Sequence, residues 1–68
     1  METFKIKDDH IKLGQLLKAA GFVENGAAAK TEIIEGRVKV NGEVCLQRGK
    51  KMYPGDVAEF EGNSIKVE

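Results

Sequence analysis

The spacing of apolar residues changes near residue 36, from a helical period to the alternation that is typical of strands. In the first half, four apolar positions recur at intervals of three and four residues and would form one stripe on a helix. In the second half, Val38 and Val40 alternate with Lys39, as in a strand with one buried face. The pattern therefore predicts helices followed by a small sheet. The helical stripe consists of Leu13, Leu16, Leu17 and Ala20.

Two helices joined by a short apolar link, Phe22-Val23, are expected in the first half. The first helix should begin near His10, with Asp8 or Asp9 as its N-cap, and end at Gly21. A short strand with one buried face, residues 3–6, should precede it. The polar side of the first helix would carry Lys12, Gln15 and Lys18.

The second helix is predicted from Asn25, as its N-cap, to about Glu35, with Gly36 ending it. Residues 27–29 are alanines, which favour helix and allow close packing of backbones. The bulkier apolar contacts would come from Ile33-Ile34. Together the two helices would form an αα-hairpin.

Turn signals divide the second half into strands. Asn41-Gly42 is typical of a hairpin, and its register stays open, because a two-residue loop pairs Lys39 with Val44 whereas a bulge pairs Val40 with Val44. Residues 53–56 read Tyr-Pro-Gly-Asp, a type II turn signal. Strands are expected at 57–60 and 64–67, with a turn at Gly62-Asn63 between them. The predicted fold is α+β, one domain over residues 1–68 with two packed helices against a small, mostly antiparallel β-sheet.

Composition excludes several classes of protein. The chain has 68 residues, no apolar run long enough to span a bilayer and no secretory leader, so the cytoplasm is the expected compartment. Cys45 is the single cysteine and has no neighbours at metal-ligand spacing, so neither a disulfide nor a metal site is expected. His10 and Cys45 lie too far apart in sequence to indicate a nucleophile and its base. We therefore expect no catalytic residues and no cofactor.

Charge is balanced overall, with eleven basic and eleven acidic side chains, but it is unevenly distributed. Residues 30–51 carry six basic groups against three acidic ones, and residues 52–68 carry one against four. A neutral protein with one basic face can bind a polyanion, because the local field and counterion release determine binding. The six basic residues are Lys30, Arg37, Lys39, Arg48, Lys50 and Lys51.

Three motifs in order resemble the αL RNA-binding motif of ribosomal protein S-four. They are Leu13 to Leu17, Gly36-Arg37-Val38-Lys39-Val40-Asn41-Gly42, and Pro54-Gly55-Asp56, and the resemblance covers about residues 10–60. The short length is similar to that of stand-alone bacterial members of the family. The resemblance implies binding of structured RNA, with ribosomal RNA and the ribosomal subunit as leading partners, and no catalysis by the domain itself.

In the family the second helix and the following strand form the RNA face, which points here to Lys30, Arg37, Lys39 and Asn41. The basic residues 48–51 could extend this face from the neighbouring segment. Recognition would then rest on RNA shape and backbone, because the aromatic residues lack the clustered spacing of a stacking platform. The candidate RNA-binding residues are Lys12, Gly26, Lys30, Arg37, Lys39, Asn41, Arg48, Lys50 and Lys51.

The chain departs from the family at the start of the second helix, where Asn25-Gly26 stands in place of the frequent Ser-Arg pair. One hypothesis is that Gly26 lets an RNA phosphate approach the helix N-terminus. The competing interpretation is that Gly26 and the alanines only let the helices pack closely. A second function class also stays open, a protein-interaction module that docks on an acidic protein, or on a basic ribosomal protein through its negative C-terminal face. In either case the protein is expected to be a monomer.

Overall fold

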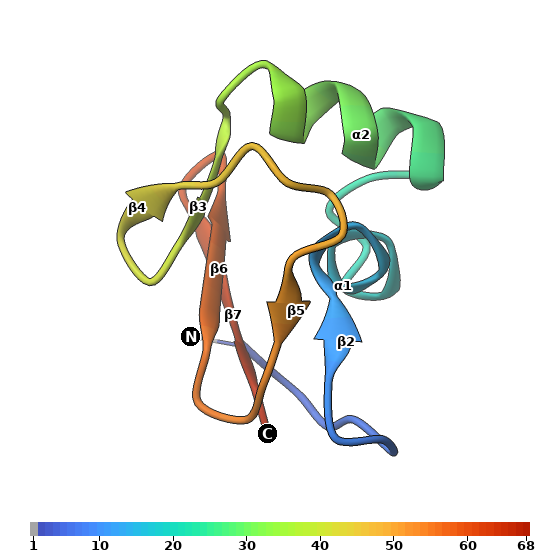
Figure 1. Ribbon diagram of the computed structural model, residues 1–68, viewed down its shortest axis with the longest axis vertical. Coiled ribbons are helices and arrows are strands. Elements are labelled where there is room, and N and C mark those ends of the chain that lie inside the picture. The colour runs from blue at the N-terminus through green and yellow to red at the C-terminus, as the bar shows by residue number, and fades with distance from the viewer. Residues whose placement is uncertain (1) are drawn as a thin grey trace.

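The computed structural model describes residues 2–68, which form two helices, a five-stranded sheet and a two-stranded ribbon (Figure 1). The five-stranded sheet has the order β1-β7-β6-β3-β4, in which β1 and β7 are parallel and the other neighbours antiparallel. The ribbon pairs β2 with β5 in antiparallel fashion. The α+β fold with a mostly antiparallel sheet is thereby confirmed. In chain order the elements are β1 (Glu2–Phe4), β2 (Ile11–Lys12), α1 (Leu13–Ala19), α2 (Gly26–Ile34), β3 (Val38–Val40), β4 (Glu43–Val44), β5 (Lys51–Met52), β6 (Val57–Phe60) and β7 (Asn63–Val67).

The core lies between the helices and one face of the five-stranded sheet. From α1 it takes the three leucines of the predicted stripe, all fully buried, whereas Ala20 is only partly buried. From α2 it takes Ala29 and Ile33, but Ile34 is 56% exposed, which corrects its predicted core role. Neighbouring helical residues are turned by about 100° from each other, and on α2 this turn carries Ile34 out of the core while Ile33 stays in it. The sheet contributes Val38, Val40, Ala58, Phe60, Ile65 and Val67.

The start of α1 differs from the prediction. The helix begins at Leu13 and not near His10, because Ile11 and Lys12 pair with Met52 and Lys51 in the ribbon. Neither predicted aspartate caps it; the Asp9 carboxylate instead lies 2.7 Å from Nδ1 of His10. Backbone pairing with a distant segment has thus replaced the local cap.

The predicted second helix, α2, and the residues predicted to end it are confirmed. The Asn25 side chain accepts a hydrogen bond from the Ala28 N–H at 2.8 Å, as an N-cap does. At the other end, Glu35 is the C-cap and Gly36 has a φ of 78°, the left-handed conformation that favours glycine.

The β3–β4 hairpin adopts the two-residue alternative. Lys39 pairs with Val44 and Val40 with Glu43, and Asn41 and Gly42 both have positive φ, as in a type I′ turn. This register places Val44 on the solvent side, where it is 54% exposed. The edge position of β4 makes that exposure possible.

Two other strand boundaries differ from the expected ones. The β6–β7 turn is formed by Glu61 and Gly62, one residue earlier than predicted, because Asn63 already pairs with Phe60 in the sheet. The first strand is Glu2–Phe4 and not residues 3–6. Its parallel pairing with β7 sets these limits.

Asp56 links the turn before β6 to the β3–β4 hairpin. Its carboxylate accepts hydrogen bonds from the Tyr53 N–H at 2.8 Å and from the Asn41 amide at 3.1 Å. The side-chain oxygen Oδ1 of Asn41 in turn accepts a hydrogen bond from the Val57 N–H at 2.9 Å. The expected type II turn is consistent with the φ of 100° at Gly55. Asn41, a candidate RNA contact, therefore has its side chain engaged within the fold.

The hydrogen bonds of Asp56 predict that the stability of the fold decreases in acid. The hydrogen bonds from Tyr53 and Asn41 hold the pKa of Asp56 below its ordinary value. A carboxyl group whose pKa is lower in the folded chain than in the unfolded chain stabilises the fold. This contribution is complete at pH values above the pKa of the unfolded chain, about 3.9, and it is lost as the pH falls through the pKa of the folded chain. We expect Asp56→Asn to cost about 1–3 kcal/mol at pH 7, and the difference from wild type to shrink below about pH 4.

Urea unfolding at a series of pH values measures this difference. Asp8→Asn is the matched control, because Asp8 is an exposed aspartate and its substitution should leave stability unchanged at every pH. A cost at Asp56 that stays constant from pH 7 to pH 3 would contradict the proposed origin of the effect.

Candidate nucleic-acid interface

A groove of about 380 Å³ lies between α1, the first residue of α2 and the loop that connects β4 to β5. Three of its lining residues, Lys12, Lys18 and Arg48, are cationic, and within residues 2–68 no carboxylate lines it. The ion pairs found in this part of the chain are made by His10 and Arg37, so these three charges are not neutralised by a direct partner. The arrangement favours an anion. The lining is completed by Gly14, Gln15, Gly26 and Gly49.

Gly14 positions Arg48 in this groove. A Cβ atom at residue 14 would lie 2.7 Å from the Cγ atom of Arg48, so only glycine lets the arginine stem cross the start of α1 at this distance. The loop is fixed there by the N–H groups of Leu13 and Gly14, which donate to the carbonyls of Lys50 and Arg48 at 2.8 and 3.1 Å. Two otherwise unpaired donors of the helix are thereby satisfied.

The start of α2 forms another part of the groove. A Cβ atom at Gly26 would have no neighbour within 4 Å, so close helix packing does not require glycine at this position. Such packing does suit Ala29, which is fully buried. The Asn25 side chain accepts the hydrogen bond from the N–H of Ala28. The N–H groups of Gly26 and Ala27 have no acceptor within the helix. Gly26 therefore leaves the N-terminus of the helix accessible from the groove.

Two further candidates lie at the margins of the groove. Lys51 pairs directly with Lys12 across the β2–β5 ribbon, and both are exposed. Lys30 is exposed one helical turn after Gly26, on the same side of α2. The structure thus brings Lys12, Gly26 and Arg48 together in the groove, with Lys51 opposite Lys12 in the ribbon and Lys30 one turn along α2 from Gly26.

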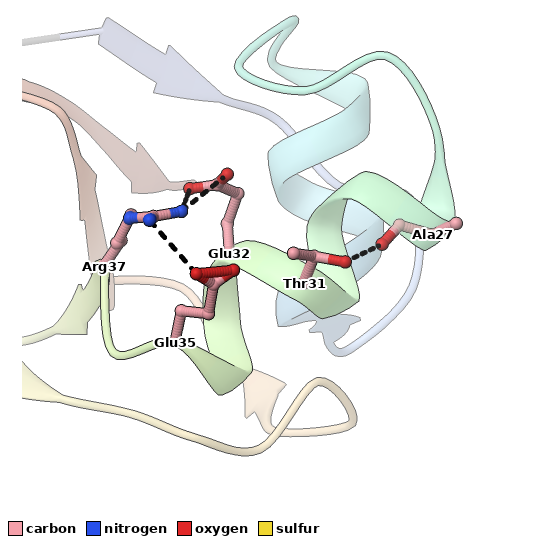
Figure 2. A network of polar contacts seen from close by, with 5 residues as sticks. All are labelled: Ala27, Thr31, Glu32, Glu35 and Arg37. Atoms are coloured by element: carbon pink, nitrogen blue, oxygen red, sulfur yellow. Dashed lines mark hydrogen bonds and ion pairs between the residues drawn. The ribbon is translucent and has the colours of Figure 1, made fainter.

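Arg37 and Lys39 lie elsewhere, on the outer side of the sheet, and Arg37 is next to the end of α2. Figure 2 shows the Arg37 guanidinium directed at Glu32 and Glu35, with N–O distances of 3.1 Å to each. The hydrogen bond to Glu32 and the two carboxylate charges raise the pKa of Arg37 above its ordinary value. Lys39 pairs with Glu59 of β6 in the sheet. This face is therefore balanced in charge, unlike the groove.

The remaining candidates, Asn41 and Lys50, line a second hollow of about 500 Å³ beside the β3–β4 hairpin. This hollow also contains Glu43 and the apolar side chains of Val44 and Leu46. It is less basic than the groove.

Gln15 and Lys18 were not among the predicted contacts, although the helical period places them with Lys12 on one face of α1. That shared face was the available signal in the sequence. Gly14 gave no comparable signal, because its role depends on Arg48 from a distant segment.

No helix of residues 2–68 is both long and apolar enough to cross a bilayer. The same range contains no group of three or more His, Cys, Asp or Glu side chains that could hold a metal ion.

Known proteins are similar to this chain in both sequence and fold. YbcJ from Escherichia coli is 43% identical over 68 residues, which cover 98% of this chain and 97% of that protein. Its solution structure, described as having an αL motif involved in RNA binding, matches with a TM-score of 0.74 over 98% of this chain and 86% of that one. The probable ribosome maturation protein RlbA of Bacillus subtilis is 46% identical over 84% of this chain and 80% of RlbA.

An uncharacterised RNA pseudouridine synthase of Aquifex aeolicus is 40% identical over 85% of this chain, but the match covers only 23% of that enzyme. Most of the synthase thus has no counterpart here. The family model described as the S4 domain matches residues 4–68. With a match of this extent, and with the helices and sheet in the arrangement of a known αL motif, the chain belongs to the S4 domain family.

Proposed function

We propose that this protein binds structured RNA in the groove between α1, α2 and the β4–β5 loop, with ribosomal RNA as the first candidate. The observation that carries the proposal is the set of three cations, Lys12, Lys18 and Arg48, around a hollow without carboxylates in the described chain. The names of YbcJ and RlbA, which refer to RNA binding and to ribosome maturation, support the same role. We place this role in ribosome assembly in the cytoplasm, performed by a monomer without catalysis.

Phosphate contacts would dominate this binding. The three cationic side chains project from α1, its preceding residue and one loop, so they can contact successive phosphates of one strand. The N–H groups at the start of α2 add a neutral anion-binding element. Such contacts recognise the shape of RNA more than its base sequence.

Filter binding of wild-type protein to ribosomal RNA fragments across a salt series tests the proposal. Affinity should fall steeply with salt, because each neutralised phosphate releases counterions. An absence of binding at low salt to any structured fragment would exclude the proposed function.

The contribution of the α2 N-terminus is tested by two substitutions of one residue. Gly26→Ala adds a Cβ atom into open space, so we expect an unchanged fold and RNA affinity within about twofold of wild type. Gly26→Glu places a carboxylate where an RNA phosphate would approach the helix. It should lower RNA affinity about tenfold or more, because one charge-assisted hydrogen bond is lost. Equal and unchanged binding by both variants would show that phosphate does not approach this helix end.

A protein partner is the second candidate function, and the β4 edge is the feature that favours it. Within residues 2–68, β4 pairs with β3 alone; Val44 in β4 is 54% exposed, and Leu46 just after it is 59% exposed. An exposed edge strand with apolar side chains can accept another chain. If a protein partner uses the basic groove, free RNA will displace it; a partner at the β4 edge will remain bound.

A further inference from the structure

The β2–β5 ribbon has one buried and one exposed face. Ile11 and Met52 form the inner face, where Met52 is fully buried and Ile11 packs against the core. Lys12 and Lys51 are direct partners on the outer face, and both are exposed. Figure 1 shows this ribbon beside α1, separate from the five-stranded sheet. The outer face is thus accessible next to the groove.

An aromatic pair adjoins the two lysines. His10 precedes the ribbon and Tyr53 follows it, and their ring centroids are 5.9 Å apart with the planes inclined by 50°. Continuing the alternation of each strand by one residue puts His10 on the side of Lys12, and Tyr53 on the side of Lys51. Tyr53 is 47% exposed, which is unusual for the large aromatic residues of this fold, since Phe60 is only 6% exposed.

The opposed lysines are unfavourable for the isolated fold. Like charges directly opposite each other in an antiparallel pair destabilise it. Neither lysine has a carboxylate partner among the ion pairs of residues 2–68, and the nearby Asp9 carboxylate is engaged by His10. A bound phosphate between the two ammonium groups would remove this repulsion.

We propose that the outer face of the ribbon binds an unpaired RNA nucleotide, with its base stacked on Tyr53 and its phosphate between Lys12 and Lys51. This inference rests on the proposed function and extends it from structured RNA to a structured RNA with a single-stranded extension. Lys12 belongs both to the groove and to the ribbon, so one RNA strand can pass continuously from the first to the second.

The nucleotide must be unpaired because its base has to stack on the ring of Tyr53. Bases inside an RNA duplex are stacked on each other and present only their edges, whereas an unpaired base exposes a face to an aromatic side chain. The ribbon would therefore bind a different part of the RNA from the groove. The groove requires only phosphates that are spaced as in a folded RNA, whereas the ribbon requires an unpaired base.

Tyr53 also provides a specific reporter, because it is the only tyrosine of the chain and the chain has no tryptophan. The experiment compares an RNA hairpin without an extension to the same hairpin with three unpaired nucleotides at its 5′ end or its 3′ end. With wild-type protein, one of the two extended hairpins should bind about fivefold or more tightly than the blunt one, the gain expected from one stacked base. That RNA alone should quench tyrosine emission, after correction for absorption by the RNA.

Two substitutions of Tyr53 separate stacking from other effects. Tyr53→Leu should abolish the gain from the extension, and Tyr53→Phe should retain it, because phenylalanine preserves the aromatic face. Both leave the backbone N–H that donates to Asp56, and circular dichroism verifies the fold.

Equal binding of blunt and extended hairpins by wild type, without quenching, would overturn the ribbon inference while leaving RNA binding in the groove intact. A gain from the extension that persists fully in Tyr53→Leu would also overturn it. If none of the hairpins or ribosomal RNA fragments binds at all, both this inference and the proposed function fail.

Discussion

Reversing the charges of Lys18 and Arg48 to glutamate is expected to abolish RNA binding while leaving the fold intact. Both residues line the groove, and their side chains make no ion pairs within residues 2–68 that the substitutions would break. Each charge-assisted contact to phosphate contributes about 1.5–3 kcal/mol, so losing two lowers affinity at least about 100-fold. The slope of log affinity against log salt should become shallower by about two.

The control carries the same change in net charge at a different place. Arg37→Glu with Lys39→Glu alters the charge-balanced outer face of the sheet, so its RNA affinity should remain within about threefold of wild type. Both double variants are compared by filter binding over a salt series, with circular dichroism to establish that they are folded. If the Arg37 and Lys39 variant loses affinity and the Lys18 and Arg48 variant does not, the RNA face is the outer side of the sheet at β3 and not the groove.

These two variants also separate what the sequence could predict from what it could not. The period-two pattern correctly indicated that Arg37 and Lys39 lie outside the core, next to buried valines. It contained no information on the partners of Arg37, which come from the end of α2 and bring two carboxylates to one guanidinium. Local periodicity determines on which side a side chain lies, whereas its neighbours depend on how the elements pack.

The same distinction explains the successes and errors in the fold. The N-cap at Asn25, the left-handed Gly36 and the Asn41-Gly42 turn were predictable because each depends on a few adjacent residues. The ribbon was not predictable, because β2 has two residues and exists only through pairing with β5 from the far side of the chain. That pairing moved the start of α1 to Leu13 and created the groove.

The groove was accessible to sequence analysis only in part. The polar face of α1 follows from helical spacing, so Lys12, Gln15 and Lys18 could be placed on one side of it. The approach of Arg48 requires the absence of a side chain at Gly14, and no pattern along the sequence relates these two residues. The predicted RNA-binding residues as a set remain a prediction, which the binding experiments above can test.

Truncating Leu17 to alanine is expected to remove a large part of the stability of this domain. Leu17 is fully buried, and removing a buried leucine side chain costs about 2–5 kcal/mol. At about 0.05–0.15 kcal/mol per residue, the whole domain would have only about 3–10 kcal/mol of stability. Urea unfolding should therefore show a large part of the unfolding free energy lost. Leu46→Ala is the matched control, because Leu46 is 59% exposed and its truncation should change stability by less than about 0.5 kcal/mol.

The effect of Leu17→Ala on RNA binding should differ in kind from that of the charge reversal. Leu17 faces the core, whereas Lys18 of the same helix lines the groove, so molecules that remain folded keep all groove contacts. Apparent affinity should fall only by the unfolded fraction, and saturating RNA should raise the unfolding midpoint through its binding to the folded state. The Lys18 and Arg48 variant should instead be folded and show no such rise. If Leu17→Ala binds RNA weakly even under conditions where it is fully folded, packing beneath α1 also shapes the groove, and the separation between core and binding surface proposed here is wrong.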